Sequence, residues 1–438
     1  MSKGLLLIAS FVVMLCDGAV FAQSTERHLS IEEMFAMADQ NSKTIKAQRA
    51  AVEVAHHGVR EAQAGRLPDI DLSLSASYLG NGHLTDRNFS DGQNIPMPHF
   101  GNNFAVEASQ LVYGGGVVDS SIALAKLQHE MATVGLEASR SGVHFALVGY
   151  YLELYKLNNL IEVYEQNIAL AKKIIAEVES RNAQGVALLN DVTRYKLRLK
   201  NLELMKIKLQ NSADIINSEL VTLLDMDADT IIVPDSKVLE QTPPRDGVAW
   251  WQEQALSNAY SLRQGSLAVR VSLQQERLAK ADRLPKVALF AGNHFDGPIT
   301  IEVPVIDKNF NYWYVGVGVS FKLSSLYKSN RTIKRAALAT SHQQRELEQM
   351  HDKVSLAVNA DYVRYEEAYD VVATTEQSVE LATQNYDVVN TRYANGIALV
   401  TDMIDAANEL LNAELQLVNA RINIIFSYYK LCHTSGNI

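Results

Sequence analysis

Two long stretches of this chain contain no proline, and this pattern constrains the fold more than any other feature. No proline lies between Pro98 and Pro234, and none follows Pro304. A proline in a helix interior costs about 3 kcal/mol, and both stretches are rich in Leu, Ala, Glu, Lys and Gln, which favour helix. The sequence therefore predicts very long helices, of about 98 Å over residues 119–183 at 1.5 Å per residue.

Apolar positions in both stretches recur at alternating spacings of four and three residues. One series runs through residues 147–178 and the other through residues 358–393. Such a series forms the packing seam of a coiled coil, so we interpret its tyrosines, among them Tyr151 and Tyr365, as packing residues. A solvent-exposed structural coiled coil would show the same pattern, and the pattern alone leaves that alternative open.

The chain also carries an internal duplication. Residues 181–191 read RNAQGVALLND and residues 392–402 read RYANGIALVTD, with six of the eleven positions identical at an offset of 211. The tripeptide RLP at residues 66–68 recurs at residues 283–285, at an offset of 217. Similarity that keeps its register over such spans indicates a duplicated unit. Each copy reads helix, two strands and a long helical hairpin.

The first residues indicate export. Lys3 precedes a mostly apolar run of 11 residues, and a small-x-small cleavage site ends at Ala22. The run is too short to span a bilayer as a helix, so residues 1–22 are predicted to be a signal peptide. A lipoprotein signal built on Cys16 is the alternative. The rest of the chain divides into a first repeat at 23–224, a linker at 225–247 and a second repeat at 248–438.

Composition and missing motifs exclude several classes of protein. The mature chain keeps only Cys432 and cannot form an internal disulfide, and its net charge of −10 without a basic stripe argues against nucleic acid. No later stretch approaches 18 consecutive apolar residues, so no transmembrane helix is predicted. The chain has no HExxH, GxSxG, Walker or CxxC motif. His56 and His57 are adjacent on a helix, so their rings point apart. We therefore predict no enzyme, no metal and no cofactor.

Four segments alternate apolar and polar residues with a period of two. After Pro68 the apolar side chains stand at every second position from Ile70 to Tyr78, and residues 104–113, 287–291 and 313–323 show similar alternation. Most are close to the length that a tilted strand needs to cross a bilayer; a half-buried strand of a soluble sandwich is the alternative for any one segment. Four strands are too few to close around a channel, and lipid does not tolerate open edges. The sequence therefore predicts a barrel shared between chains.

These motifs, in their order and duplication, resemble the TolC family of outer-membrane efflux proteins over essentially the whole mature chain. The likeness rests on the two RLP tripeptides, on SQLVYGGG at residues 109–116, and on the duplicated turns Arg181, Gly185, Asp191 and Arg392, Gly396, Asp402. The second strand-to-helix crossing, at residues 320–325, lacks the glycines. The resemblance implies an α+β membrane protein. A homotrimer with four strands per chain would form a twelve-stranded outer-membrane β-barrel, continued by a long α-helical coiled-coil barrel in the periplasm.

The resemblance also implies a function. The chain would be a passive exit duct in outer-membrane lipid, serving a tripartite efflux or type I secretion system. An inner-membrane pump of the RND or ABC type would load it through a periplasmic adaptor (membrane fusion) protein. The alternative is a structural trimeric coiled-coil surface protein without a transport role, which would have no need to repeat a strand pair in both halves of the chain.

The candidate functional site lies at the helix turns marked by Gly185 and Gly396. Asp402 and Asp405 stand three residues apart just past the second turn, so they share a helix face. In a trimer they would make two stacked rings of three carboxylates, which favour cations at a constriction. An ordinary solvated helix face is the alternative.

The resemblance implies two further residues of a periplasmic gate, Tyr393 and Asp191. Ala398 stands where family members can carry an Arg, so a charged latch is predicted to be missing here. In the first copy Arg194 stands where Asp405 stands in the second. Arg194 is therefore a candidate partner for Asp405 of a neighbouring coil.

Overall fold

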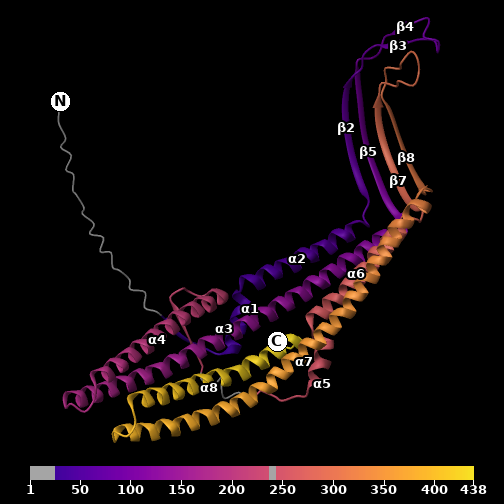
Figure 1. The fold of residues 1–438 in the computed structure, drawn as a ribbon. Helices are drawn as coiled ribbons and strands as arrows, with labels where there is room; N and C mark the ends of the chain where they lie inside the picture. The colour runs from indigo at the N-terminus through magenta and orange to yellow at the C-terminus, as the bar shows by residue number, and fades with distance from the viewer. Residues whose placement is uncertain (1–24, 236–242) are drawn as a thin grey trace, which may run out of the picture. The chain divides into compact units, whose positions relative to one another are not determined.

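The computed structural model describes residues 25–235 and 243–438, so the predicted signal peptide at residues 1–22 lies outside the described part. The same order of two shorter helices, long strands and a long helical hairpin occurs in both halves of the described chain (Figure 1). The elements in chain order are β1 (Thr25–Leu29), α1 (Ile31–Asn41), α2 (Lys43–Ala64), β2 (Asp69–Tyr78), β3 (Gly82–Leu84), β4 (Gln93–Ile95), β5 (Phe100–Tyr113), α3 (Val117–Ala183), α4 (Leu189–Leu224), β6 (Thr230–Pro234), α5 (Val248–Asn258), α6 (Tyr260–Ala281), β7 (Lys286–Gly297), β8 (Phe310–Ser320), α7 (Ser325–Ala394) and α8 (Val400–Ser435).

The long helices form where the proline-free stretches predicted them. Helix α3 has 67 residues and α7 has 70. The predicted seam in α3 is mostly buried and the one in α7 is buried or half-buried, and Tyr151 and Tyr365 are both fully covered. Both tyrosines are packing residues, as expected from their spacing. The predicted first helix of each repeat is instead two helices, because the backbone at Ser42 and at Ala259 leaves the helical conformation.

Two compact units make up the chain. Unit 1 comprises Met1–Met37 and Tyr150–Gln241, and unit 2 comprises Ala38–Gly149 and Thr242–Ile438. Both units therefore combine segments that are distant in the sequence, and each is described by itself below.

Unit 1 contains a parallel strand pair that the sequence did not reveal. Strand β1 pairs with β6, so the predicted linker at residues 225–247 includes a strand. The Tyr151 hydroxyl donates to the Leu29 carbonyl at 2.8 Å and accepts the Asp235 N–H at 2.7 Å. The Asn217 amide bonds the β6 backbone twice, at 2.8 Å each. Burial raises the pKa of Tyr151 to about 12, so its hydroxyl stays a donor at any ordinary pH.

Unit 2 contains an antiparallel sheet with the strand order β2-β5-β7-β8. Paired residues of adjacent strands lie on the same face of a sheet, so the register assigns the faces. The face that includes Leu74, Phe104, Phe295 and Asn311 has no acidic or basic side chain in any of the four strands. We call it the apolar face, and the opposite one, which includes Ser75 and Glu107, the polar face.

Two details of the sheet differ from the predicted alternation. The pattern predicted a strand reaching residue 323, but β8 ends at Ser320. The Ser325 hydroxyl and N–H both donate to the Lys322 carbonyl, at 2.7 and 2.8 Å. This turn leads into α7, so residue 323 does not join the strand. In the first copy a β-bulge between Leu111 and Tyr113 shifts the alternation by one residue.

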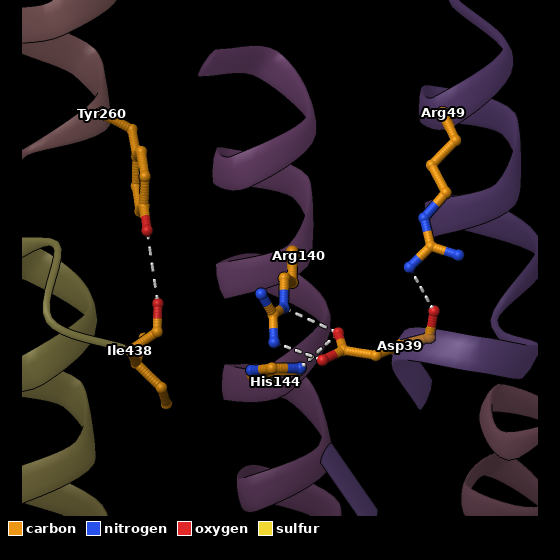
Figure 2. Close-up of polar contacts among 6 residues, drawn as sticks. All are labelled: Asp39, Arg49, Arg140, His144, Tyr260 and Ile438. Atoms are coloured by element: carbon orange, nitrogen blue, oxygen red, sulfur yellow. Dashed lines mark hydrogen bonds and ion pairs between the residues drawn. The ribbon is translucent and has the colours of Figure 1, made fainter. Parts of the chain in front are cut away.

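The helices of unit 2 carry a cluster of polar side chains as well as an apolar core formed by α5, α7 and α8. Figure 2 shows the carboxylate of Asp39, from α1, between two side chains of α3. Arg140 Nε donates to Asp39 Oδ1 at 2.7 Å, and His144 Nε2 lies 3.0 Å from the same oxygen. Ser141, the residue after Arg140 on α3, has its hydroxyl 2.9 Å from Nδ1 of His433, which belongs to α8.

Acid is expected to loosen this cluster. Burial lowers the pKa of His144 and of His433 below the ordinary value of 6.5, in spite of Asp39 beside one and Asp361 near the other. The unfolded state therefore binds protons first as the pH falls below about 6.5, and stability is lost from there down to the folded pKa values. Amide exchange of residues 140–148, corrected for its intrinsic rate, should be several-fold faster at about pH 5.5 than at about pH 7.5. A His144→Gln/His433→Gln variant should show a smaller change, and equal changes in the two proteins would contradict this account.

Candidate functional site

The two helix turns share one backbone conformation. In both turns a glycine takes a left-handed φ, +76° at Gly185 and +74° at Gly396. The N–H of the next residue then bonds back to the last helical turn, at 2.9 Å to Arg181 O in one and to Arg392 O in the other. A Cβ at either glycine would meet nothing within 4 Å. The glycines are therefore required for their φ and not for space.

The aspartates after the turns have a structural role that the sequence reading missed. Asp191 Oδ2 accepts the Leu188 N–H at 3.3 Å, and Asp402 Oδ2 accepts the Leu399 N–H at 3.0 Å. Each carboxylate thus binds a backbone N–H that has no partner within its helix, and it lies where the helix dipole favours negative charge. The signal was available in the sequence, because an Asp stands six residues after the glycine in both copies.

The remaining predicted residues differ in exposure. Asp405 is exposed, as is Asp402, and Arg194 on α4 is exposed as well. Tyr393 is buried at the end of α7. Ala398 stands where family members can carry an Arg. Its backbone N–H donates to the Arg392 carbonyl at 3.3 Å and so helps to close the turn. Asp191 and Arg194 belong to unit 1, and Tyr393, Asp402 and Asp405 belong to unit 2.

Exposed apolar side chains surround both glycines, and sequence reasoning missed them. Val186 and Leu188 are 75% and 70% exposed at one turn, and Ile397 and Leu399 are 77% and 69% exposed at the other. Large apolar side chains exposed at matching positions are typical of a contact surface. The sequence does contain a signal for them. The residues beside both duplicated glycines are apolar at positions that follow neither the period of a helix nor that of a strand.

The described residues contain no group of three or more His, Cys, Asp or Glu side chains arranged to hold a metal ion. The rings of His56 and His57 are 6.0 Å apart and nearly perpendicular, and His56 is closer to His129 of α3, at 5.5 Å. Among the described helices, none is both long and apolar enough to cross a bilayer.

The sequence profile of one family, described as outer membrane efflux protein, matches residues 35–225 and 251–436. Outer membrane protein TolC of Vibrio cholerae serotype O1 is 19% identical over 439 residues, which cover 100% of this chain and 96% of that protein. Outer membrane efflux protein BepC of Brucella suis biovar 1 is 19% identical over 446 residues, covering 99% and 90%.

The fold matches solved structures of outer-membrane channels. The outer membrane protein VceC from Vibrio cholerae superposes with a TM-score of 0.77 at 18% sequence identity, over 93% of this chain and 96% of that one. The family profile and the structural match each cover most of the chain. The chain belongs to the outer membrane efflux protein family, the TolC family, and is a protein of the outer membrane with its helical part in the periplasm.

Proposed function

We propose that this chain forms, as a homotrimer, the exit duct of a tripartite efflux or type I secretion system. The observation that carries the proposal is an open sheet whose apolar face has no acidic or basic side chain. Strands β2 and β8 each have one neighbour among the described strands, and they run in opposite directions. Strand β8 of one copy can therefore pair antiparallel with β2 of the next. Such pairing removes every open edge, as lipid requires, and three copies give twelve strands.

The long helical hairpins support a tunnel below that barrel. Helix α3 would measure about 100 Å and α7 about 105 Å at 1.5 Å per residue. A coiled-coil tunnel of that length lets cargo pass the periplasm without meeting its water phase. We infer that the two hairpins of each copy are the two products of a sequence duplication.

The exposed apolar side chains at Val186, Leu188, Ile397 and Leu399 support a partner at the helix tips. We infer that this partner is a periplasmic adaptor that connects the duct to an inner-membrane pump of the RND or ABC class. A structural surface coiled coil would have no need for such side chains at both of its turns. The family match favours the duct for the same chain.

The gate is inferred to lie at the tips that carry Asp402 and Asp405. Both carboxylates are exposed on α8, and three copies would place six of them around one axis. The equivalent helix α4 carries Asp191 but has the cation Arg194 at the second position. Only one hairpin type is then doubly acidic, which is what a constriction formed by that hairpin alone requires. Tyr393 and Asp191 are inferred to support this closure through packing and capping.

The mass of the assembled protein tests the shared barrel. Multi-angle light scattering of the mature protein in detergent should give three times the mass of one chain after subtraction of the micelle. The reason is that a single chain leaves the outer edges of β2 and β8 unpaired. A stable, folded monomer would contradict the shared barrel and with it the duct.

A further inference from the structure

A row of aromatic side chains follows the polar face of β7 and β8. Tyr312 and Tyr314 stand two positions apart in β8, so they share a face, and their ring centroids are 6.5 Å apart. The imidazole of His294, on β7, stacks on both, at 5.2 and 5.7 Å. Phe310 stacks on Tyr312 at 5.3 Å, and Phe290 meets the edge of Tyr314 at 5.9 Å. We call these five residues the aromatic ladder.

A carboxylate stands within the ladder. Glu107 Oε1, on β5, lies 3.2 Å from His294 Nε2 and accepts the Tyr314 hydroxyl at 3.4 Å. The Glu107 side chain is 55% exposed, so these contacts leave part of it accessible. Three strands thus contribute one carboxylate and a set of stacked rings to a single surface.

Structural need explains only part of the ladder. A Cβ at Gly292 would lie 2.6 Å from the Tyr314 ring, and one at Gly316 would lie 2.6 Å from the Phe290 ring, so these two rings cover glycines of the neighbouring strand. Aromatic cover of strand glycines stabilises sheets. Tyr312 and Phe310 are not the nearest contacts of any strand glycine and are 38% and 52% exposed.

The charges around the ladder are predominantly negative. The polar face of the four strands carries Asp69, Asp71, Glu107 and Asp296, and its one Lys or Arg is Lys286, at the first residue of β7. On β2 the same face is a stripe of serines after Asp71. Aromatic faces attract cations through their negative π-clouds, and acidic rings favour cations in a pore. The surface therefore suits a cation that carries an aromatic ring.

We propose that the aromatic ladder and Glu107 form a binding track for aromatic organic cations inside the barrel. The inference rests on the proposed function, because the polar face lines a lumen only when the apolar face meets lipid. Rings of such a cation would stack on Tyr312 and Phe310, while its charge would lie against Glu107. Three copies would set three ladders around the lumen, separated by the serine stripes of β2.

Block of single-channel current by benzyltrimethylammonium tests the track. Tetramethylammonium supplies the charge without the ring, and benzyl alcohol supplies the ring without the charge. Benzyltrimethylammonium added at the extracellular side should block at a concentration about tenfold lower than either. Equal potency of benzyl alcohol would overturn the cation preference.

Matched variants assign the effect to the ladder. Tyr312→Ala/Tyr314→Ala should raise the blocking concentration about tenfold, and Tyr312→Phe/Tyr314→Phe, which keeps both rings, should stay close to the parent. Trp313→Ala removes an aromatic ring on the apolar face between the two tyrosines and should change nothing. Block of the double Ala variant at the parent's concentration would overturn the proposal.

Calorimetric titration of the assembled protein in detergent separates this inference from the duct itself. Ring-dependent binding of benzyltrimethylammonium by a protein that carries no current would contradict the duct but support the ladder. A conducting protein without ring-dependent binding would contradict the ladder and leave the duct intact.

Discussion

Replacing Leu74 by Arg should prevent this protein from accumulating in the outer membrane. Leu74 lies in the middle of β2 on the apolar face, and it is 78% exposed in a single chain. An Arg at the bilayer midplane of a membrane barrel costs about 2–4 kcal/mol, and a trimer incurs that cost three times. The measurement is the amount of protein in isolated outer membranes, together with its migration as a trimer on unheated electrophoresis gels.

The adjacent residue provides the control for this variant. Ser75 lies on the polar face, opposite Asn103 of β5. Ser75→Arg introduces the same side chain into the same strand but on the face inferred to line the lumen. This variant should accumulate and assemble close to the parent level. If Ser75→Arg were lost and Leu74→Arg were tolerated, the two faces would be assigned the wrong way round.

Removing the charges of Asp402 and Asp405 should abolish block of the duct by multivalent cations from the periplasmic side. Two unit charges 4 Å apart attract by about 1 kcal/mol even in water, and the trimer loses six carboxylates. The concentration of a trivalent cation that halves the current should therefore rise by at least about tenfold. Single-channel recording with the cation on the periplasmic side measures this.

Asparagine is the suitable replacement, because Asp402 also caps α8 through the Leu399 N–H. An Asn side-chain oxygen can accept that bond, whereas Ala would remove it and destabilise the turn by about 1 kcal/mol. The control is Asp191→Asn at the equivalent cap of α4, which should leave the block unchanged. A double variant blocked as strongly as the parent would mean that these carboxylates do not line the constriction.

The sequence predicted those elements whose cause is local. Proline-free stretches with a coiled-coil period gave α3 to within two residues of its observed start, because residues three and four apart determine which side of a helix is buried. Alternation likewise located β2 directly after Pro68. A capping box is another local feature: Ser30 and Glu33 stand three residues apart at the start of α1 and exchange bonds of 2.9 and 3.2 Å.

Features that depend on partners distant in the chain escaped prediction. Strand β1 has five residues and pairs with β6 about two hundred positions away, and no local sequence pattern predicts such a pairing. The aromatic ladder depends on the register between β7 and β8, which sets His294 beside Tyr312. At the candidate site the cap that Asp402 makes with the Leu399 N–H is local, and it was missed although the position of the Asp after the glycine indicates it.

Single-channel recording of the purified mature protein in a planar bilayer tests the central claim most directly. A duct that spans the membrane as a shared barrel should give discrete current steps of uniform size. Those steps should persist in Ser75→Arg and be sensitive to multivalent cations on the periplasmic side. A trimer that inserts into the bilayer and carries no current would contradict the duct and favour a structural coiled-coil surface protein.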